Sequence, residues 1–202
     1  MNEKSVLLIG GTSHTGKSFL AQAVRARTGW TYISTDMLAR HPGRPWPSGS
    51  NSVPAHVVEH YSTLSTEERM HSVIAHYRSL WPTIEDRIET HLEGSLTQEG
   101  CVIEGSAILP ENFAGYSADK VAVIWLTASD SLLENRIRQE SRYSSASEEG
   151  RVLIDNFIRR ALAFNRWVMA DVQKHQLQSV AVDERTTIDD LVSAVGEDIS
   201  FP

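Results

Sequence analysis

Short apolar runs alternate with longer segments of helical periodicity along most of the chain. The short runs are rich in β-branched and aromatic residues, as is typical of buried strands, and they cover residues 6–9, 30–33, 100–104, 121–126 and 178–182. In the longer segments, apolar residues recur three and four positions apart, which indicates amphipathic helices. This alternation predicts an α/β fold, a three-layer sandwich around a mainly parallel sheet of about five strands.

Several helical segments have recognisable ends. The helix after the first strand is expected to end near Gly29, because glycine favours the C-terminal stop of a helix. A second helical stretch runs from residue 66 to about residue 98, and Pro82 within it should either start a new helix or kink a continuous one. Residues 151 to about 174 have the pattern of one long amphipathic helix, and Thr187 is expected to cap a last helix.

The segment after the first strand carries the most specific chemical signal in the chain. It contains Gly11-x-x-x-x-Gly16-Lys17-Ser18, the signature of a phosphate-binding loop. Glycines let successive backbone N–H groups surround phosphate oxygens, Lys17 reaches the outer phosphates, and the Ser18 hydroxyl is offered to Mg²⁺. The alternative is a coincidental glycine-rich turn, but the strand before it and the helix after it favour the loop. The residues expected to bind nucleotide here are Gly11, Thr12, Ser13, His14, Thr15, Gly16, Lys17 and Ser18.

Composition and charge narrow the possible partners. The 202 residues suit one α/β domain spanning 1–202, and the formal net charge of −7 gives no reason to expect broad attraction to nucleic acid or to an anionic membrane. A single cysteine, Cys101, excludes an intramolecular disulfide and lies in an apolar run, where a buried small residue is expected. With no leader and no membrane-length apolar run, we expect a cytoplasmic protein. The oligomeric state stays open.

Two carboxylates follow predicted strands at positions suited to chemistry. In an open parallel sheet, ligands bind just outside the carboxyl ends of the strands. Asp36 is therefore expected to face the transferred phosphate, with Arg40 four residues later on the same face if a helix opens there. Glu104 ends another strand and is expected to support Mg²⁺ or the acceptor. The alternatives are a helix-capping aspartate beside an exposed arginine, and a glutamate that holds a backbone turn.

Residues 41–54 are rich in proline and glycine, which predicts a loop. This loop follows Asp36 closely and is a candidate cover for an acceptor, with Arg44 as an anion contact and Trp46 as a lid or stacking face. An ordinary surface connection is an equally good interpretation for either residue. Residues 37–99 as a whole are expected to form an acceptor-side insertion.

The next segment, His56-Val-Val-Glu-His60, matches a zinc-peptidase pattern. A zinc site needs a third ligand and a supporting shell, and nothing else in the sequence points to peptidase chemistry. Chance histidines on a helix are the better explanation.

A further helix is expected after a start signal at residues 127–130, and it should carry Arg136, Arg138 and Arg142. At about 100° per residue, Arg136 and Arg138 point apart, whereas Arg138 and Arg142 would share a face. We expect Arg136 to contact the nucleotide from the rigid helix, and one of the other two to join when a short lid, residues 136–151, closes. The alternative is a solvated helix face paired with Glu134 and Glu140.

Taken together, these motifs resemble the small-molecule kinases of the P-loop superfamily. The resemblance covers nearly the whole chain and rests on the phosphate loop, on residues 33–36 with Arg40, on residues 102–105 with Pro110, and on Arg136. Residues 33–36 and 103–110 are most similar to 2-phosphoglycerate kinases and zeta-toxin-like kinases. Related nucleotide kinases often carry a second lid arginine four residues beyond the first, where this chain has Glu140.

The residues and the resemblance together predict transfer of the γ-phosphate of ATP, with Mg²⁺, to a hydroxyl of a small molecule such as 2-phosphoglycerate or a similar anionic acceptor. Catalytic roles are expected for Lys17, Asp36, Arg136 and Arg142, acceptor contacts for Asp36, Arg40, Arg44 and Glu104, and metal contacts for Ser18 and Glu104. A regulatory NTPase and a nucleotide-binding protein without catalysis remain as alternatives.

Overall fold

The computed structural model describes residues 5–38, 41–49, 51–93, 100–114 and 120–196. Its centre is one sheet whose five strands pair in the order β2-β3-β1-β4-β5, and every pairing is parallel. The strands are β1 (Val6–Gly11), β2 (Thr31–Ser34), β3 (Cys101–Glu104), β4 (Val121–Ala128) and β5 (Ser179–Val182). The predicted five-stranded parallel sheet is confirmed.

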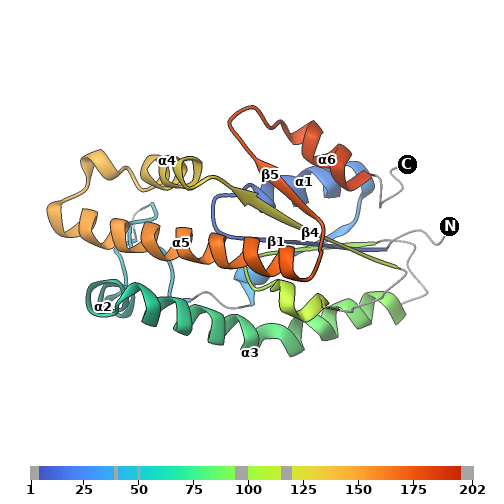
Figure 1. Ribbon diagram of the computed structural model, residues 1–202, viewed down its shortest axis with the longest axis horizontal. Coiled ribbons are helices and arrows are strands. Elements are labelled where there is room, and N and C mark those ends of the chain that lie inside the picture. Colours follow the sequence, from blue (N-terminus) through green and yellow to red (C-terminus); the bar gives the residue numbers. More distant parts are fainter. Residues whose placement is uncertain (1–4, 39–40, 50, 94–99, 115–119, 197–202) are drawn as a thin grey trace.

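Helices cover both faces of this sheet (Figure 1). They are α1 (Lys17–Thr28), α2 (Ala55–Thr63), α3 (Thr66–Glu93), α4 (Asp130–Glu140), α5 (Glu148–Lys174) and α6 (Ile188–Gly196). The described residues also form three short 3₁₀ helices, η1 (Thr35–Met37), η2 (Pro110–Phe113) and η3 (Tyr143–Ser145). Within the described residues, none of the helices is long and apolar enough to cross a membrane.

The alternation of side chains along β1 divides the core into two layers. Val6 and Leu8 pack with residues of α3 and α5, whereas Leu7 and Ile9 pack with residues of α1, α4 and α6. All four β1 side chains are fully buried. The three-layer sandwich is therefore as predicted, and β1 is covered on both sides up to the point where the phosphate loop begins.

The helix ends agree with the sequence signals at several positions. Helix α1 ends at Gly29, which has a φ of +75° and donates its N–H to the carbonyl of Arg25 at 2.8 Å. Thr187 precedes α6, and its hydroxyl accepts a hydrogen bond from the Asp190 N–H at 3.2 Å. Helix α5 begins at Glu148, three residues before the predicted start, because Ser147 caps it by accepting the N–H of Gly150 at 3.1 Å.

Pro82 lies inside one continuous helix, α3. A proline in a helix interior removes one backbone hydrogen bond, at a cost of about 3 kcal/mol. The buried side chains of Tyr77, before it, and of Ile84 and Ile88, after it, pack in the same core cluster. Burying one stripe along the whole length of α3 offsets the loss, so the alternative in which Pro82 starts a new helix is wrong.

Cys101 is fully buried at the start of β3, as expected for a small core residue. Burial raises the pKa of its thiol to about 12. The neutral thiol therefore persists at physiological pH, and this cysteine acts as a packing residue.

Candidate active site

The phosphate-binding loop connects β1 to α1 at the carboxyl edge of the sheet. Gly11 has a φ of +129°, and a Cβ at this position would lie 2.2 Å from the carbonyl oxygen of Leu126 on β4. Glycine is required there because the backbone passes so close to the neighbouring strand. Gly16, at φ +101°, then turns the chain into α1, so that the N-terminus of this helix opens toward the loop.

Lys17 is held across this loop rather than extended into solvent. The residue is buried, with 7% exposure, and its Nζ donates to the carbonyl oxygen of Thr12 at 2.7 Å. Burial lowers the pKa of Lys17, the negative charges of Glu104 and Asp36 oppose that decrease, and Arg44 adds to it. Two carboxylates and a second cation are therefore close enough to affect the charge of Lys17.

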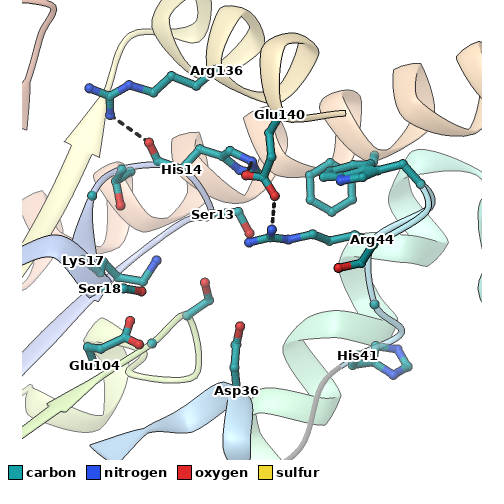
Figure 2. A pocket seen from close by; sticks show the side chains of 18 of the residues that line it. Ser13, His14, Lys17, Ser18, Asp36, His41, Arg44, Glu104, Arg136 and Glu140 are labelled. Carbon is teal, nitrogen blue, oxygen red and sulfur yellow. Dashed lines mark hydrogen bonds and ion pairs between the residues drawn. The ribbon is translucent and has the colours of Figure 1, made fainter. Parts of the chain in front are cut away.

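A cavity of about 1150 Å³ opens above the loop. The strand order determines the order of its walls: Asp36 follows β2, Glu104 ends β3, the phosphate loop follows β1, Arg136 lies on the helix after β4, and Val182 ends β5. Figure 2 shows Lys17, Asp36 and Arg44 facing the same open space. The side chains that sequence reasoning assigned to strand ends thus meet at one site.

Four of the predicted loop residues line the cavity beside Lys17 and Gly16, namely Ser13, His14, Thr15 and Ser18. Thr12 instead points into the protein, where its hydroxyl donates to the carbonyl of Ala161 on α5 at 3.2 Å. The side chain of Thr12 therefore anchors the loop to α5, while its carbonyl oxygen accepts hydrogen bonds from Thr15 and Lys17.

Glu104 and Ser18 form a pair of hard oxygen donors suited to Mg²⁺. Glu104 is buried, with 3% exposure, and its Oε1 accepts a hydrogen bond from the Tyr32 hydroxyl at 2.9 Å. The electrostatic surroundings of Tyr32 also include Ser18, which places the hydroxyl and the carboxylate in one neighbourhood. Magnesium is usually held by one or two protein oxygens together with phosphates and water. No group of three metal-ligating side chains occurs in the described part of the chain, and these two donors fit that mode of binding.

Asp36 lies on η1, immediately after β2, and lines the cavity. The helix opened there is a single 3₁₀ turn, so the expected four-residue spacing to Arg40 on an α-helix does not apply. Arg40 lies outside the described residues, and its role as an acceptor contact stays a prediction.

Arg44, Glu140 and His14 form a chain of contacts across the cavity mouth (Figure 2). Arg44 forms an ion pair with Glu140, and Nε2 of His14 lies 2.8 Å from Oε2 of Glu140. The hydrogen bond with His14, and after it the charge of Arg44, hold the pKa of Glu140 below its ordinary value although burial acts to raise it. Glu140 thus connects the 41–54 loop to the phosphate loop.

Trp46 belongs to the core beside this chain of contacts. It is 7% exposed, and its ring lies 4.8 Å from that of Phe157 in an edge-on arrangement. The His14 ring lies 6.3 Å away on another side. For Trp46, the interpretation as an ordinary surface connection is wrong, because this side chain anchors the loop while also lining the cavity.

The three arginines of the predicted lid have different surroundings. Arg136 donates to the carbonyl oxygen of His14 at 2.8 Å and lines the cavity. Arg138 contacts Glu134 at 2.9 Å and Asp155 at 3.1 Å, which agrees with the solvated alternative for this residue.

The prediction that Arg142 belongs to the same helix is wrong. Helix α4 ends at Glu140, and Arg142 has a left-handed φ of +52°. The buried stripe of α4 ends at Ile137, and the next residues are polar, so no apolar face is left to extend the helix. Arg142 is exposed and does not share a helix face with Arg138, and its catalytic role stays a prediction.

Sequence reasoning missed several residues that line the cavity. They are Tyr77, Ser106, Arg160, Val182, Thr186, Ile188 and Leu191. Arg160 had a detectable signal, because it interrupts the apolar stripe of α5 between Phe157 and Phe164. The residues after β5 had no such signal in the sequence, because their place in the cavity wall depends on how α6 packs against the sheet.

His56 and His60 have separate environments. His56 is exposed, whereas His60 is buried with ring contacts to His41 at 5.4 Å and Tyr61 at 5.0 Å. Burial lowers the pKa of His60 to about 4, with further contributions from His41 and Arg160. His60 is therefore a neutral core histidine at physiological pH.

This environment predicts a loss of stability in mild acid. Between pH 6.5 and pH 4 the unfolded chain binds a proton at His60 that the folded protein does not, so the stabilisation is complete above pH 6.5 and declines as the pH falls. We expect this residue to account for about 2 kcal/mol of the loss between pH 7 and pH 5. Urea unfolding at both pH values should show a smaller loss for His60→Gln than for the wild type. His71→Gln, on the exposed side of α3, is the control, and its free energy of unfolding should fall between the two pH values by as much as that of the wild type.

Comparisons with known proteins concern the fold. No protein-family model and no curated protein matches the sequence. The structure is similar to an unliganded sugar kinase from Janibacter sp. HTCC2649, with a TM-score of 0.51 and 14% identity over 96% of this chain and 94% of the other. It is also similar to deoxyadenosine kinase from M. mycoides with bound dATP, with a TM-score of 0.50 and 13% identity over 96% of this chain and 97% of the other. The chain therefore has the fold of the P-loop kinases.

Proposed function

We propose that this protein is an ATP- and Mg²⁺-dependent phosphotransferase that moves the γ-phosphate to a hydroxyl of a small molecule. The observation that carries the proposal is that Lys17 and Asp36 line one and the same cavity. At about 1150 Å³ it exceeds the 300–1,000 Å³ typical of one small ligand, so a nucleotide and an acceptor fit side by side.

The order in which residues line the cavity supports one orientation of the nucleotide and the acceptor. Apolar side chains of Val182, Ile188 and Leu191 line the end beyond β4, which suits a nucleobase. The phosphates then lie over the loop, where backbone N–H groups and Lys17 bind them. Asp36, on the other side of the loop, faces the acceptor.

Phosphoryl transfer at such a site depends on positioning the substrates and neutralising charge, and it needs no covalent intermediate with the protein. The acceptor oxygen forms a bond to the γ-phosphorus, the bond from that phosphorus to the bridging oxygen breaks, and ADP leaves with the electron pair. The hydroxyl proton passes to the Asp36 carboxylate. Mg²⁺, when held by Ser18 and Glu104, would neutralise phosphate charge. Arg136 and Arg44 supply further positive charge at the cavity mouth.

The first acceptor to test is 2-phosphoglycerate, because residues 33–36 and 103–110 resemble 2-phosphoglycerate kinases. ADP release should be measured with sugars, phosphorylated acids, nucleosides and aminoglycosides. Release that depends on an acceptor supports the proposal. Slow release without any acceptor indicates a regulatory NTPase, and nucleotide binding without ADP release indicates a binding protein.

Asp36→Asn should separate binding from transfer. Asparagine keeps the shape of the side chain but cannot take the acceptor proton, so ATP affinity should change less than threefold while transfer falls about a hundredfold or more. Lys17→Ala should instead weaken both, since Lys17 contacts the phosphates. Calorimetric titration with ATP and an ADP-release assay measure the two effects. If Asp36→Asn transfers phosphate at the wild-type rate, this carboxylate only caps η1.

Arg136→Ala should weaken nucleotide binding itself. Loss of a charged contact to phosphate, together with the bond to the loop at His14, is expected to raise the Kd for ATP roughly tenfold to a hundredfold. Arg142→Ala is the comparison, and its Kd should stay near that of the wild type because this side chain lies outside the cavity. Turnover of Arg142→Ala then decides whether Arg142 acts in catalysis. Equal ATP affinities for wild type and Arg136→Ala would remove Arg136 from the site.

A further inference from the structure

Arg160 is a buried cation in the wall of the cavity. It lies on α5, its residue is 4% exposed, and it lines the cavity at the end that also contains Asp36, His41 and Tyr77. None of the nucleotide-binding roles above involves it, since the phosphate loop is served by Lys17 and Arg136.

The contacts of Arg160 are with neutral groups. In the described portion of the chain it takes part in no ion pair, and its partners are the hydroxyls of Tyr61 and Tyr77 and the ring of Phe157, 4.8 Å from its Cζ. Its Nε is buried with no hydrogen-bond partner. Burial acts to lower the pKa of this guanidinium, but the two phenol groups outweigh it and leave the pKa above its ordinary value, so the charge persists.

Comparison with another buried arginine shows why this arrangement is unusual. Arg69 is 3% exposed, and it donates to the backbone carbonyls of His60 and Tyr61 at 3.4 and 3.0 Å. Those contacts use its donors within the protein. Arg160 keeps a buried donor without a partner beside an open cavity, and a buried charge without a counter-ion costs free energy.

The neighbouring titratable groups do not supply the missing negative charge. The positive charge of Arg160 contributes to lowering the pKa values of both His41 and His60, although burial is the larger cause for each. Arg69 is a second cation nearby. Two carboxylates, Asp36 and Glu104, line the same cavity, but Asp36 is assigned to the acceptor hydroxyl and Glu104 to Mg²⁺, and among the described residues neither forms an ion pair with Arg160.

We propose that Arg160 binds an anionic group of the phosphoryl acceptor, a carboxylate or a phosphate, while Asp36 faces the hydroxyl that is phosphorylated. This inference rests on the proposed function and specifies its acceptor class. Tyr77 and Ser106 lie in the same wall, and their hydroxyls are near enough to interact, which leaves at least one hydroxyl proton as a donor for the anion. An acceptor without an anionic group would leave Arg160 unpaired in a desolvated site, so the protein should discriminate strongly against neutral acceptors.

The test uses four probes with one three-carbon skeleton. Glycerol is neutral, glycerate carries a carboxylate, glycerol 2-phosphate carries a phosphate, and 2-phosphoglycerate carries both. Each is titrated calorimetrically into protein saturated with Mg²⁺ and a non-hydrolysable ATP analogue, so that the phosphate loop is already filled. We expect at least one anionic probe to bind tenfold or more tightly than glycerol, and the pattern distinguishes carboxylate from phosphate recognition.

Substitutions then assign that preference to one side chain. Arg160→Met should reduce affinity for the favoured anionic probe at least tenfold, and Arg160→Lys should restore part of it. Arg159→Met is the matched control, because the adjacent arginine is exposed and donates to Asn156 at 3.0 Å outside the cavity. Its affinities should equal those of the wild type. If Arg160→Met does not fold, comparing the anion preference of the wild type with that of Arg160→Lys still tests whether Arg160 binds the anion.

The proposal is overturned if the wild type binds none of the anions, if it does not prefer them to glycerol, or if Arg160→Met binds them as well as Arg159→Met does. Phosphoryl transfer is measured separately by ADP release. Binding of an anion through Arg160 without transfer to any acceptor would contradict the proposed function and leave the anion site in place. Transfer to neutral acceptors at rates unaffected by Arg160→Met would contradict the anion site and support the kinase function.

Discussion

Parallel pairing of all five strands is the constraint on which this site depends. Because every strand runs in the same direction, every carboxyl end lies at one edge of the sheet, and the residues just beyond those ends must share one space. Residues separated by nearly 150 positions in sequence, from Asp36 to Val182, thereby line one cavity. The two hydrophobic layers that cover β1 keep this edge rigid, since the strand that supplies the phosphate loop is buried along its whole length.

The electrostatics of the cavity follow from that convergence. Lys17 is buried beside the loop, and the nearby carboxylates of Glu104 and Asp36, together with its hydrogen bond to the Thr12 carbonyl, offset the cost of burying its charge. Arg44 approaches the same lysine and is restrained by Glu140. A bound polyphosphate would relieve the repulsion between the two cations, so we infer that nucleotide binding and the position of the 41–54 loop are coupled.

The sequence was sufficient where local pattern determines structure. The apolar runs located the strands, the glycine and lysine spacing located the loop, and the strand ends at Asp36 and Glu104 located two carboxylates of the site.

The sequence was insufficient where packing between distant segments determines the structure. Arg142 was placed on a helix because charge spacing continued past Glu140, although the buried stripe had already ended. Trp46 looked like a loop residue, and only the contact with Phe157, over 100 positions later in the chain, shows that it is core. Arg160 was passed over because a long amphipathic helix tolerates single polar residues on its apolar side.

Helix α5 has a consequence for the size of the molecule that the site accepts. The hydroxyl of Thr12 in the phosphate loop is bonded to the carbonyl of Ala161, and Arg160 is the residue next to that anchor. One helix therefore holds both the loop that binds the nucleotide phosphates and the cation proposed to bind the acceptor. Because the same helix positions both, we expect the spacing between the hydroxyl and the anionic group to become a selected property of the acceptor. Homologous compounds lengthened by one or two methylene groups would present the right charges at the wrong separation, and the protein would reject them by length.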